Sequence, residues 1–172
     1  VWDPTDAGDQ PRGKQVRTPH GIMYTAVTGI WQTVWLEPVP TRYIHGLKLT
    51  PDVDNARLHV EIATKLTRSD NVKVEVLVDG QVIAQANGLN HVEVAIPQPH
   101  LWSPDDPFLY DARITLGHFN LPRITDQVTA YFAMRKISVE KDESDINRLF
   151  LNGKPLFQYG PLDQGWWLYG LY

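Results

Sequence analysis

Residues 71–86, NVKVEVLVDGQVIAQA, contain the pattern that decides the fold. Valine occupies every second position over Val72–Val78, which is the period-two pattern of a half-buried β-strand. Asp79-Gly80 follows, and this dipeptide supplies the positive backbone angles that a two-residue hairpin turn requires. Val82–Ala86 then returns as the partner strand. The stretch therefore predicts an antiparallel β-hairpin.

The same alternation recurs on both sides of this hairpin. Over Arg57–Ala63 it is strict, with apolar residues on one face and polar residues on the other. We expect further strands at Tyr43–Leu49, Arg57–Ala63, Val92–Ile96, Tyr110–Leu116 and Val128–Met134. Turn residues separate these segments, and no convincing amphipathic helix interrupts them. The pattern predicts an all-β fold, a two-sheet antiparallel sandwich.

The segment before the sandwich, Gly29–Glu37 (GIWQTVWLE), reads as one strand with both tryptophans on the same face. Pro38-Val39-Pro40 follows, and we place the main domain boundary at this stiff linker. The chain begins at Val1 without a basic-then-apolar leader. From this start we expect the chain to have been cut from something longer.

Asn152-Gly153 is a strong hairpin-turn signal after the sandwich. It lies between Arg148–Leu151 and Pro155–Gln158, which we expect to pair. The acidic run Glu140–Asp145 before it is interpreted as a solvated loop. The chain stops on the aromatic cluster Gly165–Tyr172, which an autonomous domain would not leave in water, so we expect this end to be cut as well.

The composition excludes several classes of function. The 172 residues include 20 acidic and 16 basic side chains, so the formal net charge of -4 excludes an electrostatically driven nucleic-acid binder. The chain lacks a run of about 18 apolar residues that could span a bilayer. Thirteen prolines and six tryptophans without any cysteine indicate many short segments and leave the redox compartment open. We expect no cofactor, no nucleic-acid partner and no membrane partner.

The acidic residues do not form a catalytic pattern. Acid-base chemistry on a glycoside needs two carboxylates that converge across a cleft, about 5 to 9.5 Å apart. Three glutamates instead fall on the polar faces of alternating strands, where we expect solvated positions: Glu61, Glu75 and Glu93. The N-terminal aspartates lack the spacing and the distal glutamate of a calcium loop, so we interpret them as turn residues: Asp3, Asp6 and Asp9.

The histidines show neither i, i+4 nor His-x-His spacing along the chain, which argues against a metal site. They are His20, His45, His59, His91, His100 and His118. No serine lies in a Gly-x-Ser-x-Gly elbow, and the sequence has neither a phosphate loop nor a dinucleotide fingerprint. We therefore expect no metal site in this chain.

Two aromatic segments are candidates for contact with a sugar. Trp102, within LWSPDDP at 101–107, lies where a loop joins two strands, and its ring could stack on a sugar or plug the end of the sandwich. We favour the second role, in which the Trp102 ring plugs the end of the sandwich. The terminal segment combines polar side chains with adjacent aromatic faces, which suits pyranose recognition and packing equally well. Its candidate substrate-binding residues are Asp163, Gln164, Trp166 and Trp167.

Four short motifs follow one another: GIWQTVWL at 29–36, LWSPDDPFLY at 101–110, YFAMR at 131–135 and LNGKP at 151–155. In this order they resemble glycoside hydrolase family 2, the group of β-galactosidases, β-glucuronidases and β-mannosidases. The first resembles the end of that family's N-terminal jelly-roll domain. The second and third resemble signatures of its immunoglobulin-like domain, and the fourth resembles the hairpin that opens its catalytic (β/α)8 barrel.

The resemblance implies the end of a jelly-roll at 1–38, an immunoglobulin-like β-sandwich at 39–137 and the first strands of a (β/α)8 barrel at 138–172. It also implies that the chain packs against the missing parts of the jelly-roll and the barrel. The family's catalytic glutamates would lie far downstream of Tyr172, so we assign no catalytic residue. Ala133 and the GPLDQG sequence at 160–165 depart from the family pattern, and no particular sugar is implied.

The resemblance favours a non-catalytic scaffold portion of a retaining glycoside hydrolase that acts on O-glycosyl bonds in carbohydrate metabolism. The whole protein would bind carbohydrate and hydrolyse it, whereas the 172-residue chain alone would be inactive. An extracytoplasmic setting, periplasmic or secreted, is implied by the resemblance alone. The alternative is a stand-alone carbohydrate-binding or adhesion module in which Trp102, Trp166 and Trp167 form a sugar platform. A structural domain that binds a partner protein is a third interpretation.

Overall fold

The computed structural model describes residues 14–26, 29–30, 32–118 and 121–162. The chain divides into two compact units, one formed by Val1–Glu37 with Pro161–Tyr172 and the other by Pro38–Gly160. Every regular element in the described ranges is a β-strand, and none of these residues forms a helix able to cross a membrane. The domain limits that the sequence suggests, 38/39 and 137/138, remain a prediction.

The described part of the first unit contains one small ladder, in which β1 (Gln15–Val16) pairs in parallel with β2 (Tyr24–Thr25). The prediction of a strand at Gly29–Glu37 is wrong for the residues of this segment that the structure describes, because they lie in no strand. Trp31 lies outside the described residues. A strand is stable when a neighbour accepts and donates its backbone hydrogen bonds. No described strand pairs with this segment.

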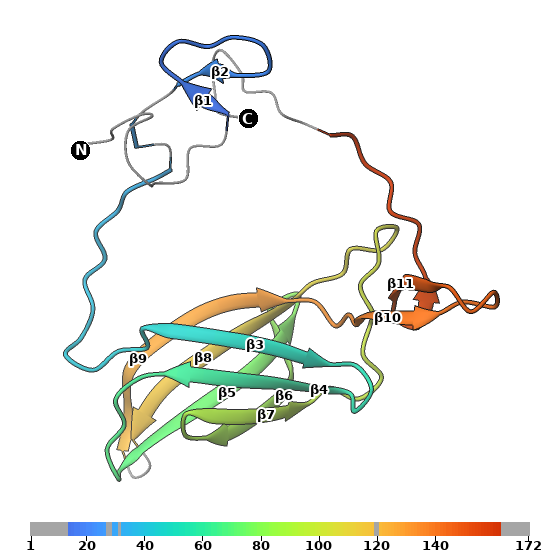
Figure 1. The fold of residues 1–172 in the computed structure, drawn as a ribbon. Coiled ribbons are helices and arrows are strands. Elements are labelled where there is room, and N and C mark those ends of the chain that lie inside the picture. Colours follow the sequence, from blue (N-terminus) through green and yellow to red (C-terminus); the bar gives the residue numbers. More distant parts are fainter. Residues whose placement is uncertain (1–13, 27–28, 31, 119–120, 163–172) are drawn as a thin grey trace. The chain divides into compact units, whose positions relative to one another are not determined.

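The second unit contains an immunoglobulin-like sandwich of two antiparallel sheets (Figure 1). One sheet has the order β3-β4-β7, from β3 (Gly46–Asp52), β4 (Arg57–Ala63) and β7 (His91–Ala95). The other has the order β6-β5-β8-β9, from β6 (Gln81–Gly88), β5 (Asp70–Val78), β8 (Tyr110–His118) and β9 (Leu121–Phe132). The predicted all-β sandwich is confirmed.

The predicted hairpin is present as β5 and β6, which pair with each other across Asp79-Gly80. Asp79 has φ 48° and Gly80 has φ 76°, so both turn residues adopt the left-handed region that a type I′ turn needs. Because a two-residue turn leaves no length for a crossover, β6 joins the sheet of β5. This gives the β5 sheet four strands and the β4 sheet three.

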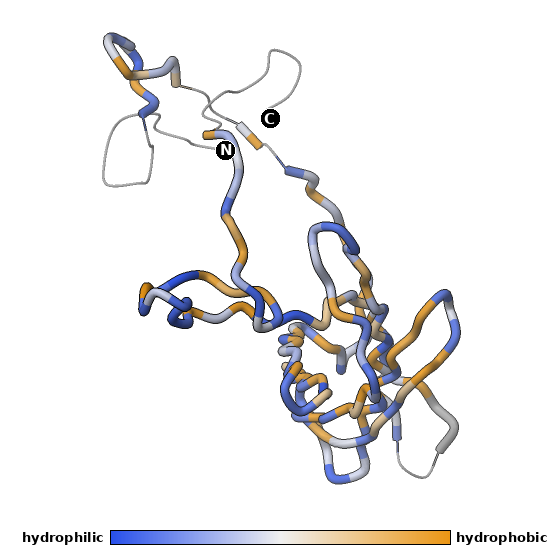
Figure 2. The backbone as a smooth tube through the Cα atoms, turned by 90° about the vertical axis from the view of Figure 1, so that its right-hand side faces the viewer, coloured by the Kyte–Doolittle hydropathy of each residue, from blue (hydrophilic) through white to orange (hydrophobic). Residues whose placement is uncertain are grey.

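The core lies between the two sheets and uses the apolar faces that the alternation predicts. Side chains of β4 and β5 meet there, and hydrophobic and hydrophilic residues succeed each other along the strands (Figure 2). The largest fully buried apolar side chains are Leu58, Val60, Val72, Val74, Val76, Val94, Ile96, Ile114, Leu116 and Met134. Each contributes roughly 1.5–3 kcal/mol by leaving water, so the sheets hold together without a disulfide.

Two strand boundaries differ from the prediction. The opening strand is β3 at Gly46–Asp52 rather than Tyr43–Leu49, because Tyr43 O accepts a hydrogen bond from the Thr64 hydroxyl instead of joining the ladder. At the other end β9 stops at Phe132, and Met134 makes an isolated parallel bridge with Leu101. The chain therefore changes pairing partner where it leaves the sandwich.

A third antiparallel sheet follows, with the order β10-β11-β12 from β10 (Ile137–Lys141), β11 (Asn147–Leu151) and β12 (Lys154–Pro155). The predicted Asn152-Gly153 turn is present, with φ 53° and 74°. Glu140 lies in β10, so only the second half of the acidic run is a turn, because pairing with β11 continues to Lys141↔Asn147. The strand predicted at Pro155–Gln158 is shorter than expected, since its pairing ends at Pro155.

Candidate functional site

The loop that contains the LWSP motif folds back on itself between β7 and β8. Ser103 N donates to Asp106 O at 3.0 Å, and Asp106 N donates to Ser103 O at 3.1 Å. Pro104 occupies the second position of this four-residue turn, where its fixed φ is favoured. His100 Nε2 lies 2.6 Å from Asp106 Oδ2 and ties the turn to the preceding part of the same loop. The motif thus encodes a closed turn.

A ladder of aromatic rings connects this loop to the core. The His100 ring stacks on Phe108 with centroids 4.2 Å apart, Phe108 meets Tyr110 edge-on at 4.9 Å, and Tyr110 stacks on Phe132 at 5.3 Å. Tyr110 is 3% exposed, and its hydroxyl accepts a hydrogen bond from His100 N at 2.7 Å. The contact resembles the tyrosine corner of immunoglobulin-like folds, in which a tyrosine hydroxyl bonds to the backbone upstream of it. The ladder fixes the loop against the sandwich.

Replacing Tyr110 by phenylalanine is expected to lower the free energy of unfolding by about 1–2 kcal/mol. The ring contacts are retained, but the His100 N–H loses its acceptor in a part-buried place. Urea denaturation of the two proteins measures the difference. Tyr131→Phe is the matched control, because Tyr131 is 71% exposed. Loss of its hydroxyl is expected to change the free energy of unfolding by less than about 0.5 kcal/mol. Equal effects of the two substitutions would contradict the role of the hydroxyl.

Trp102 lies beside the chain as it leaves the sandwich. Its backbone N donates to Met134 O at 3.0 Å, and the Arg135 guanidinium carbon lies 4.8 Å from the centroid of the indole ring. A cation over an aromatic face is held by the charge distribution of the ring. One face of Trp102 is therefore covered by Arg135, which favours packing at the end of the sandwich over a sugar platform.

Asn152 joins the third sheet to this end of the sandwich. Its Oδ1 accepts from Lys136 N at 2.9 Å, its Nδ2 donates to Trp102 O at 2.9 Å, and its backbone N donates to Lys136 O at 2.8 Å. The turn residue of the LNGKP motif thus bonds to the LWSP loop, 50 residues earlier, and to the linking residue Lys136. These three contacts form what we call the exit joint.

An exposed ion pair adds to the exit joint. Lys136 Nζ lies 2.6 Å from Asp54 Oδ2, in the turn between β3 and β4. The hydrogen bond to Asp54 and the charge of that carboxylate raise the pKa of Lys136. Both side chains reach water, so the pair contributes little stability on its own. It does hold the linking residue over the same end of the sandwich as Trp102.

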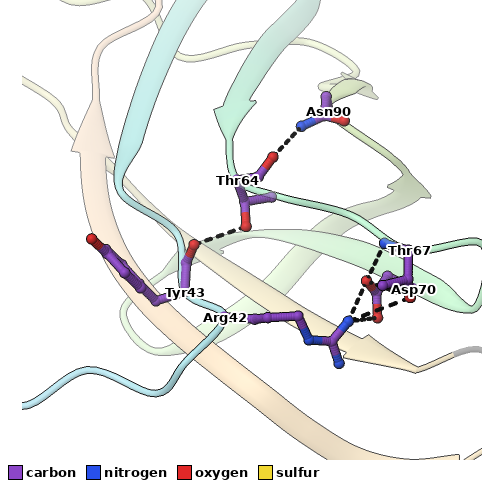
Figure 3. A network of polar contacts seen from close by, with 6 residues as sticks. All are labelled: Arg42, Tyr43, Thr64, Thr67, Asp70 and Asn90. Carbon is purple, nitrogen blue, oxygen red and sulfur yellow. Dashed lines mark hydrogen bonds and ion pairs between the residues drawn. The ribbon is translucent and has the colours of Figure 1, made fainter.

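The opposite end of the sandwich holds the residues that lead into β3 (Figure 3). Arg42 Nη1 donates to both carboxylate oxygens of Asp70, at 2.7 and 2.6 Å, and Asp70 is completely buried. Thr67 donates to Asp70 Oδ2 through its backbone N at 2.6 Å and its hydroxyl at 2.9 Å. Ile44 N donates to Asp126 Oδ2 at 2.8 Å. Figure 1 shows that the chain enters at one end and leaves at the other.

The three glutamates expected at solvated positions do not resemble an acid catalyst. The pKa of each carboxyl group is lowered, chiefly by a hydrogen bond from a basic side chain. The donor is Lys48 for Glu61, Arg113 for Glu75 and Arg57 for Glu93. A glycosidic general acid needs a raised pKa. Glu61 and Glu93 are exposed, as expected.

Glu75 corrects that expectation, because it is only 7% exposed. Its strand β5 is central in its sheet, so side chains from the same strand and from β8 cover it. Lys73 Nζ donates to Oε1 at 2.6 Å, and Arg113 Nε donates to Oε2 at 2.8 Å. Alternation places Glu75 on the outer face but does not show how fully its neighbours cover it.

The remaining candidate residues from the sequence lie outside the residues that the structure describes. The four candidate sugar-binding residues lie beyond the described ranges: Asp163, Gln164, Trp166 and Trp167. The N-terminal aspartates lie outside them as well: Asp3, Asp6 and Asp9. Sequence reasoning missed the Arg42–Asp70 pair, which periodicity does not mark. It identified Asn152 only as a turn former, not as the side chain that joins two sheets.

Comparisons with known proteins agree with the motifs. The family model described as Glycosyl hydrolases family 2 matches residues 42–135. The β-glucuronidase of Rattus norvegicus is 29% identical over 164 residues, covering 91% of this chain and 24% of the relative. The β-galactosidase of Lactococcus lactis is 26% identical over 138 residues, covering 78% of this chain and 13% of the relative.

A solved structure has the same fold. The β-glucuronidase from Ruminococcus gnavus in complex with D-glucuronic acid superposes with a TM-score of 0.58 and 18% identity, over 70% of this chain and 20% of that one. The chain spans about a quarter of the length of the mammalian β-glucuronidases that it matches. Because the family model covers more than half of it, from Arg42 at the start of the sandwich to Arg135 over Trp102, the chain belongs to the glycosyl hydrolases family 2.

Proposed function

We propose that the chain is a non-catalytic scaffold portion of a retaining glycoside hydrolase that acts on O-glycosyl bonds. The observation that carries this proposal is the exit joint, in which Asn152 bonds to Trp102 and Lys136 at once. A sandwich fixed to the next sheet by a turn side chain holds whatever follows that sheet in one orientation. This is the mechanical property that a spacer domain needs.

The third sheet supports the proposal through its apolar face. Ile137 and Val139 lie two residues apart on β10, and Val139 pairs directly with Leu149 on β11, so the three side chains share a face. They are 66%, 65% and 42% exposed. A contiguous apolar face of this kind marks a contact surface. We propose that a catalytic barrel in a longer polypeptide covers it.

The substrate of the longer enzyme is proposed from the relatives, which are named as β-glucuronidases and β-galactosidases. We propose a β-linked glycoside, hydrolysed by carboxylates about 5 Å apart on the barrel. Glu61, Glu75 and Glu93 do not suit that role, because their lowered pKa values and their lysine and arginine partners are those of structural ion pairs.

The 172-residue chain is expected to release no nitrophenol from nitrophenyl β-D-glucuronide or nitrophenyl β-D-galactoside. A longer polypeptide that carries this chain and a barrel is expected to hydrolyse at least one of them. Absorbance assays at equal molar concentration measure both. Turnover by the 172-residue chain would refute the scaffold role. Saturable quenching of its tryptophan fluorescence by a polysaccharide would instead favour the stand-alone binding module.

A further inference from the structure

Three potential metal ligands meet on the outer face of the β3-β4-β7 sheet. His91 and Glu93 lie two residues apart on β7, so their side chains leave the same face of the strand. His59 on β4 is directly opposite Glu93 in the antiparallel register. The pairing therefore brings the His59 imidazole to His91 and Glu93, which lie more than 30 residues later in the sequence, so spacing along the chain gave no sign of the group.

The distances suit coordination of one ion. Glu93 Oε1 lies 3.5 Å from His59 Nδ1 and 3.6 Å from His91 Nε2. One ligand atom from each of the three residues lies within 4.8 Å of the others. A tetrahedral Zn²⁺ with bonds of about 2.0–2.2 Å sets its ligand atoms roughly 3.3–3.6 Å apart. The two separations from Glu93 already match this range, and the third, between the two imidazole nitrogens, is no longer than 4.8 Å.

Neighbouring residues orient the ligands as the outer shell of a metal site does. Arg57 Nη1 donates to Glu93 Oε2 at 2.8 Å, which leaves Oε1 facing the two rings. Asp52 Oδ2 lies 3.6 Å from His59 Nε2, so its negative charge faces the ring nitrogen opposite the proposed ligand atom Nδ1. Carboxylate, histidine and metal follow one another in this way in many zinc sites.

We propose that His59 Nδ1, His91 Nε2 and Glu93 Oε1 bind one divalent transition-metal ion of the Zn²⁺ class, with water at the remaining position. Two imidazoles and a carboxylate are the ligand set that such ions prefer, whereas Mg²⁺ and Ca²⁺ prefer oxygen ligands alone. The ion links β4 to β7 on the surface of the sandwich. This inference goes beyond the scaffold role and does not depend on it.

Isothermal titration of the 172-residue chain with ZnCl₂ is expected to show one saturable site. His91→Gln and Glu93→Gln are expected to weaken it at least tenfold, and Asp52→Asn by about tenfold through His59. His20→Gln is the matched control, since it removes an exposed imidazole in the other unit. The side chains of His91 and Glu93 are 55% and 42% exposed, so these variants are expected to keep the fold and the metal-free melting temperature.

A thermal scan gives a second readout. Zn²⁺ at about 100 times its dissociation constant is expected to raise the melting temperature of the unsubstituted chain by about 5–10 °C. His91→Gln is expected to abolish most of that rise, and Mg²⁺ at the same concentration is expected to give none. Absence of saturable Zn²⁺ binding overturns the proposal. An equal loss in His20→Gln, or an equal rise with Mg²⁺, also overturns it.

Discussion

Replacing Asp70 by alanine is expected to lower the free energy of unfolding by about 3 kcal/mol. The carboxylate is completely buried and accepts hydrogen bonds from Arg42 and Thr67, so the substitution removes all of them and leaves a cavity. Removing one partner of a buried ion pair costs about 3–5 kcal/mol. We take the lower limit because the Arg42 side chain is 35% exposed and water can solvate it when Asp70 is lost.

Urea denaturation at neutral pH measures this loss, and Asp111→Ala is the matched control. Asp111 lies exposed on β8, and its removal is expected to change stability by less than about 0.5 kcal/mol. A loss for Asp70→Ala that is no larger than for Asp111→Ala would show that the Arg42–Asp70 pair does not anchor the start of the sandwich.

The substitution Asp70→Asn changes the shape of the side chain less than Asp70→Ala does. The pH dependence of its effect on the free energy of unfolding tests the same contact. Burial acts to raise the pKa of Asp70, but the hydrogen bonds from Thr67 and Arg42 and the charge of Arg42 together lower it. A lowered pKa in the folded state gives stability that is present above the unfolded value of about 3.9 and is lost as the pH falls through the folded value. The stability difference between the original chain and Asp70→Asn is therefore expected to be constant near neutral pH and to shrink below about pH 4.

Much of the sandwich is predictable from sequence because its signals are local. Alternation specifies both the strand and its buried face, as in Arg57–Ala63, whose bounds and inward residues the structure matches. The two turns, Asp79-Gly80 and Asn152-Gly153, are predictable because few residues tolerate positive φ. The strand predicted at Gly29–Glu37 is wrong for the residues of it that the structure describes, because a strand also needs a pairing partner, which local sequence does not specify.

The site is less predictable, since its contacts join residues that are distant in sequence. Arg42 and Asp70 are 28 residues apart, and Asn152 and Trp102 are 50 apart. His59 and His91 meet only because β4 and β7 pair in one register. A shift of that register by one residue would send the two rings to opposite faces. Such contacts follow from topology, which a single sequence specifies only through the completed fold.

Asn152→Ala is expected to lower the free energy of unfolding by about 2–3 kcal/mol and to loosen the third sheet first. The substitution removes the side-chain hydrogen bonds to Lys136 N and Trp102 O, each contributing about 1 kcal/mol. It also forces alanine into φ 53°, which costs about 1 kcal/mol more than asparagine at that position. Urea denaturation measures the total, and hydrogen exchange of β10 and β11 reports where the structure opens.

Asp79→Ala separates the two contributions, because Asp79 occupies the same turn position at φ 48° with an exposed side chain. It is expected to cost only the backbone part, about 1 kcal/mol, and to leave exchange in β10 and β11 unchanged. Asn152→Gly supplies the reverse comparison, since glycine accepts positive φ but lacks both side-chain hydrogen bonds. If Asn152→Ala costs no more than Asp79→Ala, the exit joint is only a turn. If Asn152→Gly, whose backbone accepts positive φ, still speeds exchange in the third sheet, the lost amide group is what couples that sheet to the sandwich.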